Sequence, residues 1–386
     1  MYKIINKKKL LATMVADIIG NIIFFRKLLS KKSEEIKPGN IKEILIIRTA
    51  YIGDVVMTMP MLKPLKELYP MSRITFLTCT GAKDLFKGCP YVDAVIAYDA
   101  FWFYPGRIKS YLSFLKEFRK KRYDLVIEAR ADIRDILFVM YLVKSKYRVS
   151  YRVGGGGFLL THVVPFERIK HRVSYHLDII RFLGGIRIGL DWGIRLSDKE
   201  IDKAKEIFMG ETVLKVGINP GGRKGLKCWA PERYAALARR LVTECRAEVF
   251  FTGSPAEDGL IDSIIKDSGE AAYNLAGKTE LKTLAALIAR FNLFVTNDSA
   301  PLHLASAMKT PTVAIFGPSK SNETGPYGNI HRVVEKDFPC RQTCDEDVCK
   351  HVPFKECMEV ITVEDVLNAV KEVLEECRRR QHDVQA

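Results

Sequence analysis

The sequence predicts an α/β protein made of two doubly wound, Rossmann-like domains. Short apolar runs alternate with amphipathic helical stretches, which is the pattern of parallel strands that are buried on both faces and wrapped by helices. This alternation begins after Pro38-Gly39-Asn40 and begins again near residue 213. The length of 386 residues also fits two domains of about 150 residues each with short extensions.

In the first domain, Glu43–Arg48 is expected to be a central strand, because short apolar runs mark strands buried on both faces. A loop and then a helix near Val55–Leu68 follow this strand. Further strands are expected at Arg73–Thr78, Ala94–Tyr98 and Leu125–Glu128, with helical segments between them.

The second domain shows the same alternation. Its strands are expected at Val213–Asn219, Glu248–Thr252, Phe294–Thr296 and Thr312–Phe316. Its helices are expected at Pro231–Glu244, Glu257–Ser268, Leu281–Arg290, Ala300–Met308 and, last, Val363–Arg380. In the linker before it, Ser197-Asp198-Lys199-Glu200 has the residue types of a helix start.

These boundaries predict four parts: a basic amphipathic segment at 1–38, a first domain at 39–200, a second domain at 201–360, and a C-terminal helix and tail at 361–386. Ligands of open α/β sheets bind outside the carboxyl ends of the strands. Two such sheets that face each other would form a cleft between the domains. Functional residues are therefore expected in loops that follow strands.

The composition excludes several other classes of protein. Hydrophobic residues make up 47% of the chain and charged residues 28%, so the chain can bury a large core and is not disordered as a whole. With 26 glycines and 9 cysteines, it is neither collagen-like nor a small disulfide scaffold. No stretch offers the roughly 20 uninterrupted apolar residues of a membrane-spanning helix, which excludes a polytopic membrane protein.

Most of the net charge of +15 lies in two segments that are also rich in apolar residues. Residues 1–37 carry nine basic and three acidic side chains, and residues 101–123 carry seven and one, so each segment has a net charge of +6. Basic amphipathic segments lie on anionic membrane surfaces, at about 1 kcal/mol per basic side chain near the headgroups. Nucleic-acid binding is not expected, because no zinc finger or RNA-binding signature accompanies these segments.

Other interpretations of the two segments remain open. The first is a surface-lying anchor with an amphipathic helix, a cleaved or inserted N-terminal signal, or an ordinary packed helix. A cleaved signal is disfavoured, because Arg26–Lys32 rather than a small-residue cleavage site follows the apolar run. The second segment is either a core helix with a solvated basic face or a surface that contacts a membrane or a substrate.

The loop after the first predicted strand carries a candidate catalytic residue. In Arg48–Asp54, Gly53 allows a tight turn and Asp54 then stands at the start of a helix. Asp54 is therefore either an N-cap or a carboxylate placed at the cleft as a general base.

Two loops of the second domain suit phosphate groups. In Asn219–Pro231, glycines free the backbone amides, while Arg223 and Lys227 add positive charge; a basic surface turn is the alternative, and the Walker A spacing is absent. Asn297–His303 opens a helix, where amides and the Ser299 hydroxyl can bind phosphate oxygens. A capped helix would explain this last loop alone, but the three loops at equivalent sheet ends together favour a nucleotide-phosphate site.

The order and spacing of these motifs resemble those of the family 9 glycosyltransferases, the lipopolysaccharide heptosyltransferases. The resemblance covers about residues 41–375 and leaves out the first 40. It is carried by Gly53-Asp54-Val55, Thr58-Met59-Pro60, Lys227-x-Trp229-x-Pro231, Asn297-Asp298-Ser299, Leu302-His303, Gly253–Glu257, Leu275-Ala276-Gly277 and Phe316-Gly317-Pro318.

The resemblance implies a GT-B architecture with an acceptor-side first domain and a nucleotide-sugar-binding second domain. It also implies an inverting, metal-independent transfer without a cofactor, usually of heptose from ADP-heptose. Asp54 would be the catalytic base, and Lys227 would neutralise the departing diphosphate. The residues implied to hold the nucleotide sugar are Gly222, Arg223, Glu257, Asp298, Ser299, Ala300 and His303. Many members have Thr-Gly where this chain has Ser299-Ala300, a difference that bears on the donor sugar.

The implied acceptor is a lipid-anchored, phosphorylated and carboxylated sugar of the lipopolysaccharide core. Such an acceptor is anionic and fixed in a membrane leaflet, which fits the two basic apolar segments. We therefore expect a cytoplasmic protein that is peripheral on the inner face of the cytoplasmic membrane. Arg48, Arg130 and Arg134 are candidate acceptor contacts, with ordinary surface arginines as the alternative.

Two further clusters have weaker functional interpretations. The first is a cysteine cluster, for which a tetrathiolate metal site, disulfides and unlinked thiols are the alternatives. Its members are Cys340, Cys344, Cys349 and Cys357. The acidic trio Asp345-Glu346-Asp347 is far from any predicted strand end, so it is not expected to be a metal–diphosphate ligand.

Other functions compete with glycosyl transfer. A non-catalytic, membrane-tethered nucleotide-sugar binding protein would keep the donor loops without needing Asp54, and a family member with a different nucleotide sugar is a second alternative. An epimerase or dehydrogenase would need GxGxxG after the first strand. Thr49-Ala50-Tyr51-Ile52-Gly53 stands there instead.

Overall fold

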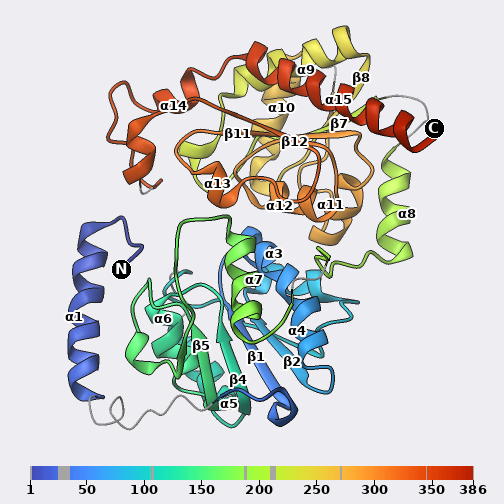
Figure 1. Ribbon diagram of the computed structural model, residues 1–386. Coiled ribbons are helices and arrows are strands. Elements are labelled where there is room, and N and C mark those ends of the chain that lie inside the picture. The colour runs from blue at the N-terminus through green and yellow to red at the C-terminus, as the bar shows by residue number, and fades with distance from the viewer. Residues whose placement is uncertain are drawn as a thin grey trace. The chain divides into compact units, whose positions relative to one another are not determined.

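The computed structural model describes residues 2–24, 35–104, 106, 108–186, 189–208, 214–269, 272–344 and 346–385 (Figure 1). The chain divides into two compact units, Met1–Arg195 and Leu196–Ala386. Each unit carries a parallel six-stranded sheet with helices around it. The predicted α/β class with two doubly wound sheets is therefore confirmed.

The sheet of the first unit has the order β3-β2-β1-β4-β5-β6. Its strands are β1 Glu43–Arg48, β2 Arg73–Thr78, β3 Ala94–Ala97, β4 Arg122–Glu128, β5 Lys144–Ser150 and β6 His162–Val163. β1 pairs in parallel with both β2 and β4, and its residues 44–47 are fully buried. The strand order reverses between β1 and β4, which is where open α/β sheets bind ligands.

The sheet of the second unit repeats this topology in the order β12-β11-β10-β7-β8-β9. Its strands are β7 Leu214–Asn219, β8 Ala247–Phe251, β9 Ala272–Asn274, β10 Leu293–Asn297, β11 Thr312–Phe316 and β12 His331–Glu335. The order reverses between β7 and β10, so the loops after these two strands lie at the switch point.

The helices of the first unit differ from the prediction over Val55–Leu68. They are α1 Lys7–Ile23, α3 Ile52–Thr58, α4 Leu62–Leu68, α5 Ile108–Phe118, α6 Ile133–Asp135 and α7 Arg172–Phe182. The single helix expected over Val55–Leu68 is two helices joined by the 3₁₀ turn Met59–Met61, which contains Pro60. Proline lacks a backbone N–H, so it does not continue a regular helix interior.

The helices of the second unit bury apolar faces on its sheet. They are α8 Asp198–Ile207, α9 Pro231–Cys245, α10 Asp258–Asp267, α11 Leu281–Ile288, α12 Ala300–Ala307, α13 Ser321–Thr324, α14 Glu356–Glu359 and α15 Val363–Gln385. α9 begins at Pro231, whose fixed φ suits a first helical position. Leu237 and Leu241 of α9 pack with Leu367 and Val370 of α15 in the same buried core.

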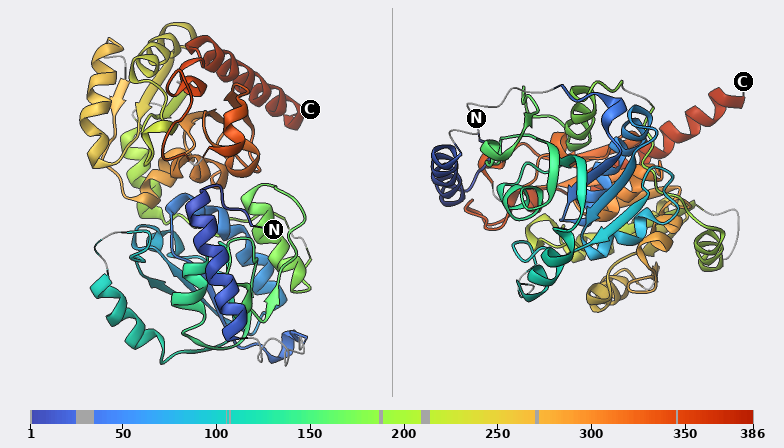
Figure 2. Two further views of the ribbon diagram at one scale, coloured as in Figure 1. Left: turned by 90° about the vertical axis from the view of Figure 1, so that its left-hand side faces the viewer. Right: turned by 90° about the horizontal axis from the view of Figure 1, so that it is seen from below.

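The expected N-terminal amphipathic helix is α1, which lies on the outside of the first unit (Figure 2). Asn6 caps it by accepting hydrogen bonds from the backbone N–H groups of Lys8 and Lys9. The basic stretch Arg26–Lys32 lies outside the described residues. Within the part of the chain that is described, no helix is long and apolar enough to cross a membrane.

Candidate functional site

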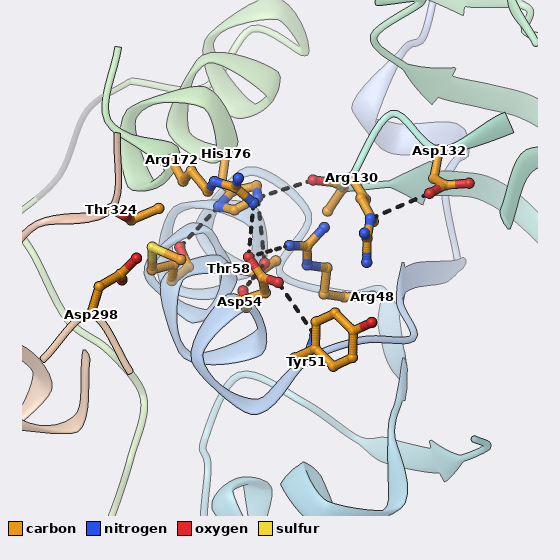
Figure 3. Close-up of polar contacts among 12 residues, drawn as sticks. Arg48, Tyr51, Asp54, Thr58, Arg130, Asp132, Arg172, His176, Asp298 and Thr324 are labelled. Atoms are coloured by element: carbon orange, nitrogen blue, oxygen red, sulfur yellow. Dashed lines mark hydrogen bonds and ion pairs between the residues drawn. The ribbon is translucent and has the colours of Figure 1, made fainter. Parts of the chain in front are cut away.

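Asp54 lies at the switch point of the first sheet, held by two arginines (Figure 3). Its Oδ1 is 2.8 Å from Nη2 of Arg48 and 3.0 Å from Nη1 of Arg172. Arg48 ends β1, Asp54 stands in the first turn of α3, and Arg172 begins α7, so three elements converge on one carboxylate. The Asp54 side chain keeps 16% of its surface exposed, so it is accessible as well as paired.

His176 fixes the helix that supplies Arg172. Its buried ring places Nδ1 2.9 Å from the Met57 carbonyl and Nε2 3.0 Å from the Ala129 carbonyl. The ring therefore ties α7 to α3 and to the end of β4. Arg172 lies four residues before His176, so both face the same side of α7. The sequence prediction missed both residues; their helical spacing was visible, but the element that they oppose was not.

A pocket of about 550 Å³ opens within the first unit, and its lining includes Arg48 and Arg172, the two arginines that hold Asp54. Its walls come from the N-terminal segment and α1, from the loop after β4, and from α7. Among the described lining residues, six are basic and one, Asp132, is acidic. The basic residues are Lys3, Lys9, Arg48, Arg130, Arg134 and Arg172. A lining of this charge favours an anionic ligand.

Asp132 orients the two pocket arginines of the β4 loop. Arg134 binds it through two bonds, Nε to Oδ1 at 2.9 Å and Nη2 to Oδ2 at 2.7 Å, and Arg130 lies 3.4 Å away. Both guanidinium groups also lie over the Phe103 ring, at 4.2 and 4.5 Å from its centroid. Burial would raise the pKa of Asp132, but its bonds to these arginines lower that pKa below the ordinary value.

The three predicted acceptor residues, Arg48, Arg130 and Arg134, thus line one pocket. Arg48 is only 2% exposed, so it is not the surface arginine that the alternative interpretation assumed. Among the described residues, the buried Nε of Arg48 and Nη1 of Arg130 have no hydrogen-bond partner. Buried hydrogen-bond donors usually have a partner, and a buried donor without one costs about 1–3 kcal/mol of stability.

Two buried acids behind the pocket stabilise its frame. Glu128 accepts hydrogen bonds from the backbone N–H groups of Arg130, at 2.9 Å, and Ala131, at 2.7 Å. Asp135 accepts from Thr49 Oγ1 at 2.8 Å. Burial, with Asp135 nearby, raises the pKa of Glu128 to about 8, and burial raises the pKa of Asp135 to about 6. These carboxyls hold the loop that carries Arg130.

In the second unit, Lys227 lies between two carboxylates. Its Nζ is 2.7 Å from Asp298 Oδ2 and 2.7 Å from Glu346 Oε2. Burial would lower the pKa of Lys227, but the two acids raise it above its ordinary value. Burial would likewise raise the pKa of Asp298, but Lys227 and His303 lower it. Both groups are therefore charged at neutral pH.

Asn297, at the end of β10, joins the two predicted phosphate loops. Its Nδ2 donates to the Pro220 carbonyl at 2.8 Å, and its Oδ1 accepts from Trp229 N at 3.1 Å and from the Tyr234 hydroxyl at 2.8 Å. The loop after β7 is thereby fixed against the start of α12. This bond pattern brings Lys227 to Asp298, as predicted from separate motifs.

The remaining predicted donor residues surround this junction. A Cβ on Gly222 would lie 3.9 Å from Ser299, and one on Gly221 would lie 1.8 Å from Glu257 Oε1, so the loop passes close to both side chains. Glu257 also accepts hydrogen bonds from Ser254 N and Oγ. Ala300 begins α12, and His303 is buried one turn later. Arg223 lies in the β7–α9 loop beside Gly222, where its side chain is exposed.

The acidic trio is closer to this site than its sequence position suggested. Besides Glu346 on Lys227, Asp347 Oδ1 lies 2.9 Å from Lys224 Nζ. These two residues thus contact lysines of the β7 loop although they follow no strand end directly, and Asp345 lies outside the described residues. The long segment after β12 folds back over the loop, which distance from a strand end does not reveal.

The cysteine cluster does not form a metal centre in the described part of the chain. No group of three or more His, Cys, Asp or Glu there is arranged to hold a metal ion, and Cys340, Cys344, Cys349 and Cys357 are not joined in disulfides. Burial raises the pKa of Cys357 to about 11, so its thiol stays protonated. Cys349 Sγ accepts from Lys355 N at 3.3 Å. The tetrathiolate and disulfide interpretations are thus not supported.

Comparison with known proteins identifies similar chains. The model of glycosyltransferase family 9 (heptosyltransferase) matches residues 111–352. Lipooligosaccharide heptosyltransferase 2 of Campylobacter jejuni (serotype O:6) is 27% identical over 342 residues, which are 86% of this chain and 99% of that protein.

Solved structures show the same fold. A family 9 glycosyl transferase from Veillonella parvula has a TM-score of 0.73 at 24% identity, and covers 87% of this chain and 97% of its own. The Escherichia coli ADP-heptose lps heptosyltransferase II has a TM-score of 0.68 at 22% identity, with coverages of 87% and 99%.

Proposed function

The chain belongs to glycosyltransferase family 9, and from that membership we propose that it transfers heptose from ADP-heptose to an anionic sugar of the lipopolysaccharide core, with inversion. The observation that carries the proposal is a basic pocket lined by Arg48 and Arg172, the same two arginines that hold the partly exposed carboxylate of Asp54. The names of the similar Campylobacter and E. coli proteins support the donor and the pathway. The GT-B class of the fold agrees with it.

The second unit would bind the donor. The β7 loop is bonded to Asn297 beside the start of α12, and Lys227 of that loop pairs with Asp298 there. A cation near the start of a helix suits a diphosphate. Negative charge grows on the departing diphosphate in the transition state, so a fixed cation there stabilises it more than the ground state. Gly222, Arg223, Asp298, Ser299, Ala300 and His303 would position phosphates and sugar, and Glu257 the ribose.

The first unit would supply the base and hold the acceptor. A sugar hydroxyl is a weak nucleophile, and a carboxylate within hydrogen-bond reach removes its proton as the new bond forms. Asp54 fits this role because Arg48 and Arg172 hold one oxygen in place. Attack opposite the leaving group would invert the anomeric carbon in one step, without a metal.

The acceptor site would be the basic pocket. Phosphate and carboxylate groups of a core sugar match the guanidinium groups of Arg48, Arg130 and Arg134 in charge and geometry. Such an acceptor is anchored in a lipid leaflet, so we propose that the protein works as a peripheral protein on the inner face of the membrane. The exposed apolar and basic residues of α1 support this location.

The donor assignment predicts a selective rise in thermal stability. ADP-heptose at 100 times its Kd should stabilise the protein by about 2.7 kcal/mol, whereas GDP- and UDP-sugars at the same concentration should have little effect. The measurement is the melting temperature with each sugar, with AMP as the control that lacks the diphosphate. A larger shift with a GDP- or UDP-sugar would overturn the assignment of an ADP-linked donor.

A further inference from the structure

We propose that α1 is part of the acceptor site. Its inner face lines one side of the pocket, where Lys9 binds an anionic group of the acceptor. Its outer face lies on the bilayer that carries that acceptor. The inference rests on the acceptor proposed above. It concerns residues outside the segment 111–352 that the family model matches.

The inner face of α1 forms part of the pocket wall. Lys9, Ala12, Thr13 and Ala16 line the pocket, and their spacing of three and four residues places them on one side of the helix. The segment before the helix adds Lys3 to the same lining. Because Ala12, Thr13 and Ala16 are small, Lys9 is the residue of this face that can reach an anionic group.

The helix is fixed to the first unit by specific contacts. Asp17 accepts a hydrogen bond from Gly156 N at 2.7 Å and another from the Tyr2 hydroxyl at 2.6 Å. A Cβ on Gly20 would lie 2.2 Å from the Phe158 ring, and one on Gly155 would lie 2.4 Å from Thr13 Cγ2. Both glycines are therefore required for this close packing. The pocket wall formed by α1 is thus an integral part of the first unit.

The glycine run Gly154–Gly157 gains a physical explanation from this contact. Gly155 and Gly156 adopt positive φ angles of 90° and 77°, which favour glycine, and the turn presents the Gly156 amide to Asp17. The glycine run thus forms the surface against which α1 packs. This links the helix at the N-terminus to the loop that follows β5.

The outer face of α1 is apolar and exposed. Its large side chains are between 41% and 70% exposed, and they are Leu11, Met14, Val15, Ile18 and Ile22. At about 100° per residue, Leu11, Ile18 and Ile22 point away from the side that carries Lys9, Thr13 and Ala16. One helix therefore presents a pocket wall on one side and an apolar stripe on the other.

Charge identifies the occupant of this stripe as an anionic bilayer. Lys7 and Lys8 are exposed at the start of the helix, and the sequence directly after it contains Arg26, Lys27, Lys31 and Lys32. Basic residues around an apolar helical stripe are typical of helices that lie in the headgroup region. Since the proposed acceptor is itself anchored in such a bilayer, its sugar would meet the pocket along α1.

The first test separates the pocket side from the membrane side with two matched charge reversals. Lys9→Glu changes a pocket residue, whereas Lys8→Glu changes an exposed neighbour that does not line the pocket. The probe is a water-soluble acceptor fragment that keeps phosphate and carboxylate but lacks acyl chains. Titration calorimetry should show roughly tenfold weaker binding for Lys9→Glu, as for loss of a charge-assisted hydrogen bond, and unchanged binding for Lys8→Glu.

The second test examines the outer face. The double variant Ile18→Asp/Ile22→Asp should lose sedimentation with vesicles of phosphatidylglycerol and phosphatidylethanolamine, yet bind the soluble fragment as the unchanged protein does. Met71→Asp is the control, because Met71 is 92% exposed elsewhere in the first unit. Retained fragment binding shows that α1 is still in place.

The outcomes are distinct from those of the proposed function. Equal effects of Lys9→Glu and Lys8→Glu on fragment binding, no fragment binding by the unchanged protein, or undiminished sedimentation of the double variant would each overturn the inference. Fragment binding that depends on Lys9, without any transfer from ADP-heptose, would support the inference and refute the proposed donor.

Discussion

Replacing Asp54 by asparagine is expected to lower kcat for sugar transfer by about 100- to 10,000-fold, which is the usual contribution of general base catalysis. Asparagine keeps the shape of the side chain and an oxygen that can accept from Arg48 and Arg172, but it does not remove a proton. Donor binding belongs to the second unit, so the melting-temperature rise with ADP-heptose should persist.

A matched control for this prediction is Asp132→Asn. Asp132 also binds arginines, but it orients Arg130 and Arg134 in the pocket and lies outside the proposed base position. Its replacement should raise KM for the acceptor more than it lowers kcat. Because loss of the Asp54 charge leaves Arg48 buried without its carboxylate, circular dichroism must show that Asp54→Asn is folded. Full activity of a folded Asp54→Asn protein would exclude Asp54 as the base.

Replacing Lys227 by methionine is expected to lower kcat by about 100- to 1,000-fold, because a preorganised charge at the leaving group contributes on this scale. The side chain is held between Asp298 and Glu346 and carries its charge into the donor junction. Methionine has a similar length, so the loop after β7 should keep its bonds to Asn297. The measurements are single-turnover transfer and the Kd for ADP.

Glu346→Gln is expected to have the opposite effect on the affinity for ADP. Glu346 forms an ion pair with Lys227 in the structure, so its carboxylate would compete with a diphosphate for the same cation. Removing that charge should tighten ADP binding, whereas Lys227→Met should weaken it. If Lys227→Met changed neither kcat nor the Kd for ADP, the assignment of the β7 loop to the diphosphate would fail.

Strands with continuous apolar runs could be predicted from the sequence, whereas very short strands and strands interrupted by charged residues could not. β1, β2 and β11 match the predicted ranges, because their apolar runs are buried on both faces. β5 and β12 were missed because Lys144–Ser150 and His331–Glu335 carry charged residues between apolar ones, and they are only partly buried. β6 and β9 are too short to give a pattern.

The site could be predicted wherever its residues directly follow a central strand. Asp54 follows β1 of the first sheet. Lys227 and Asp298 follow β7 and β10 of the second sheet, and parallel topology brings the ends of these two neighbouring strands together. Arg172, Lys9 and Glu346 come instead from a helix start, the N-terminal helix and a distant loop. Their places depend on packing of non-local segments, for which periodicity gives no signal.

The most direct test of the account is a transfer assay with ADP-heptose and a phosphorylated, carboxylated, lipid-linked sugar acceptor in vesicles. Mass spectrometry should show an acceptor that gains one heptosyl unit for each ADP released, and NMR of the product should show an inverted anomeric configuration. ADP release without a heavier acceptor, or a product with retained configuration, would contradict the account.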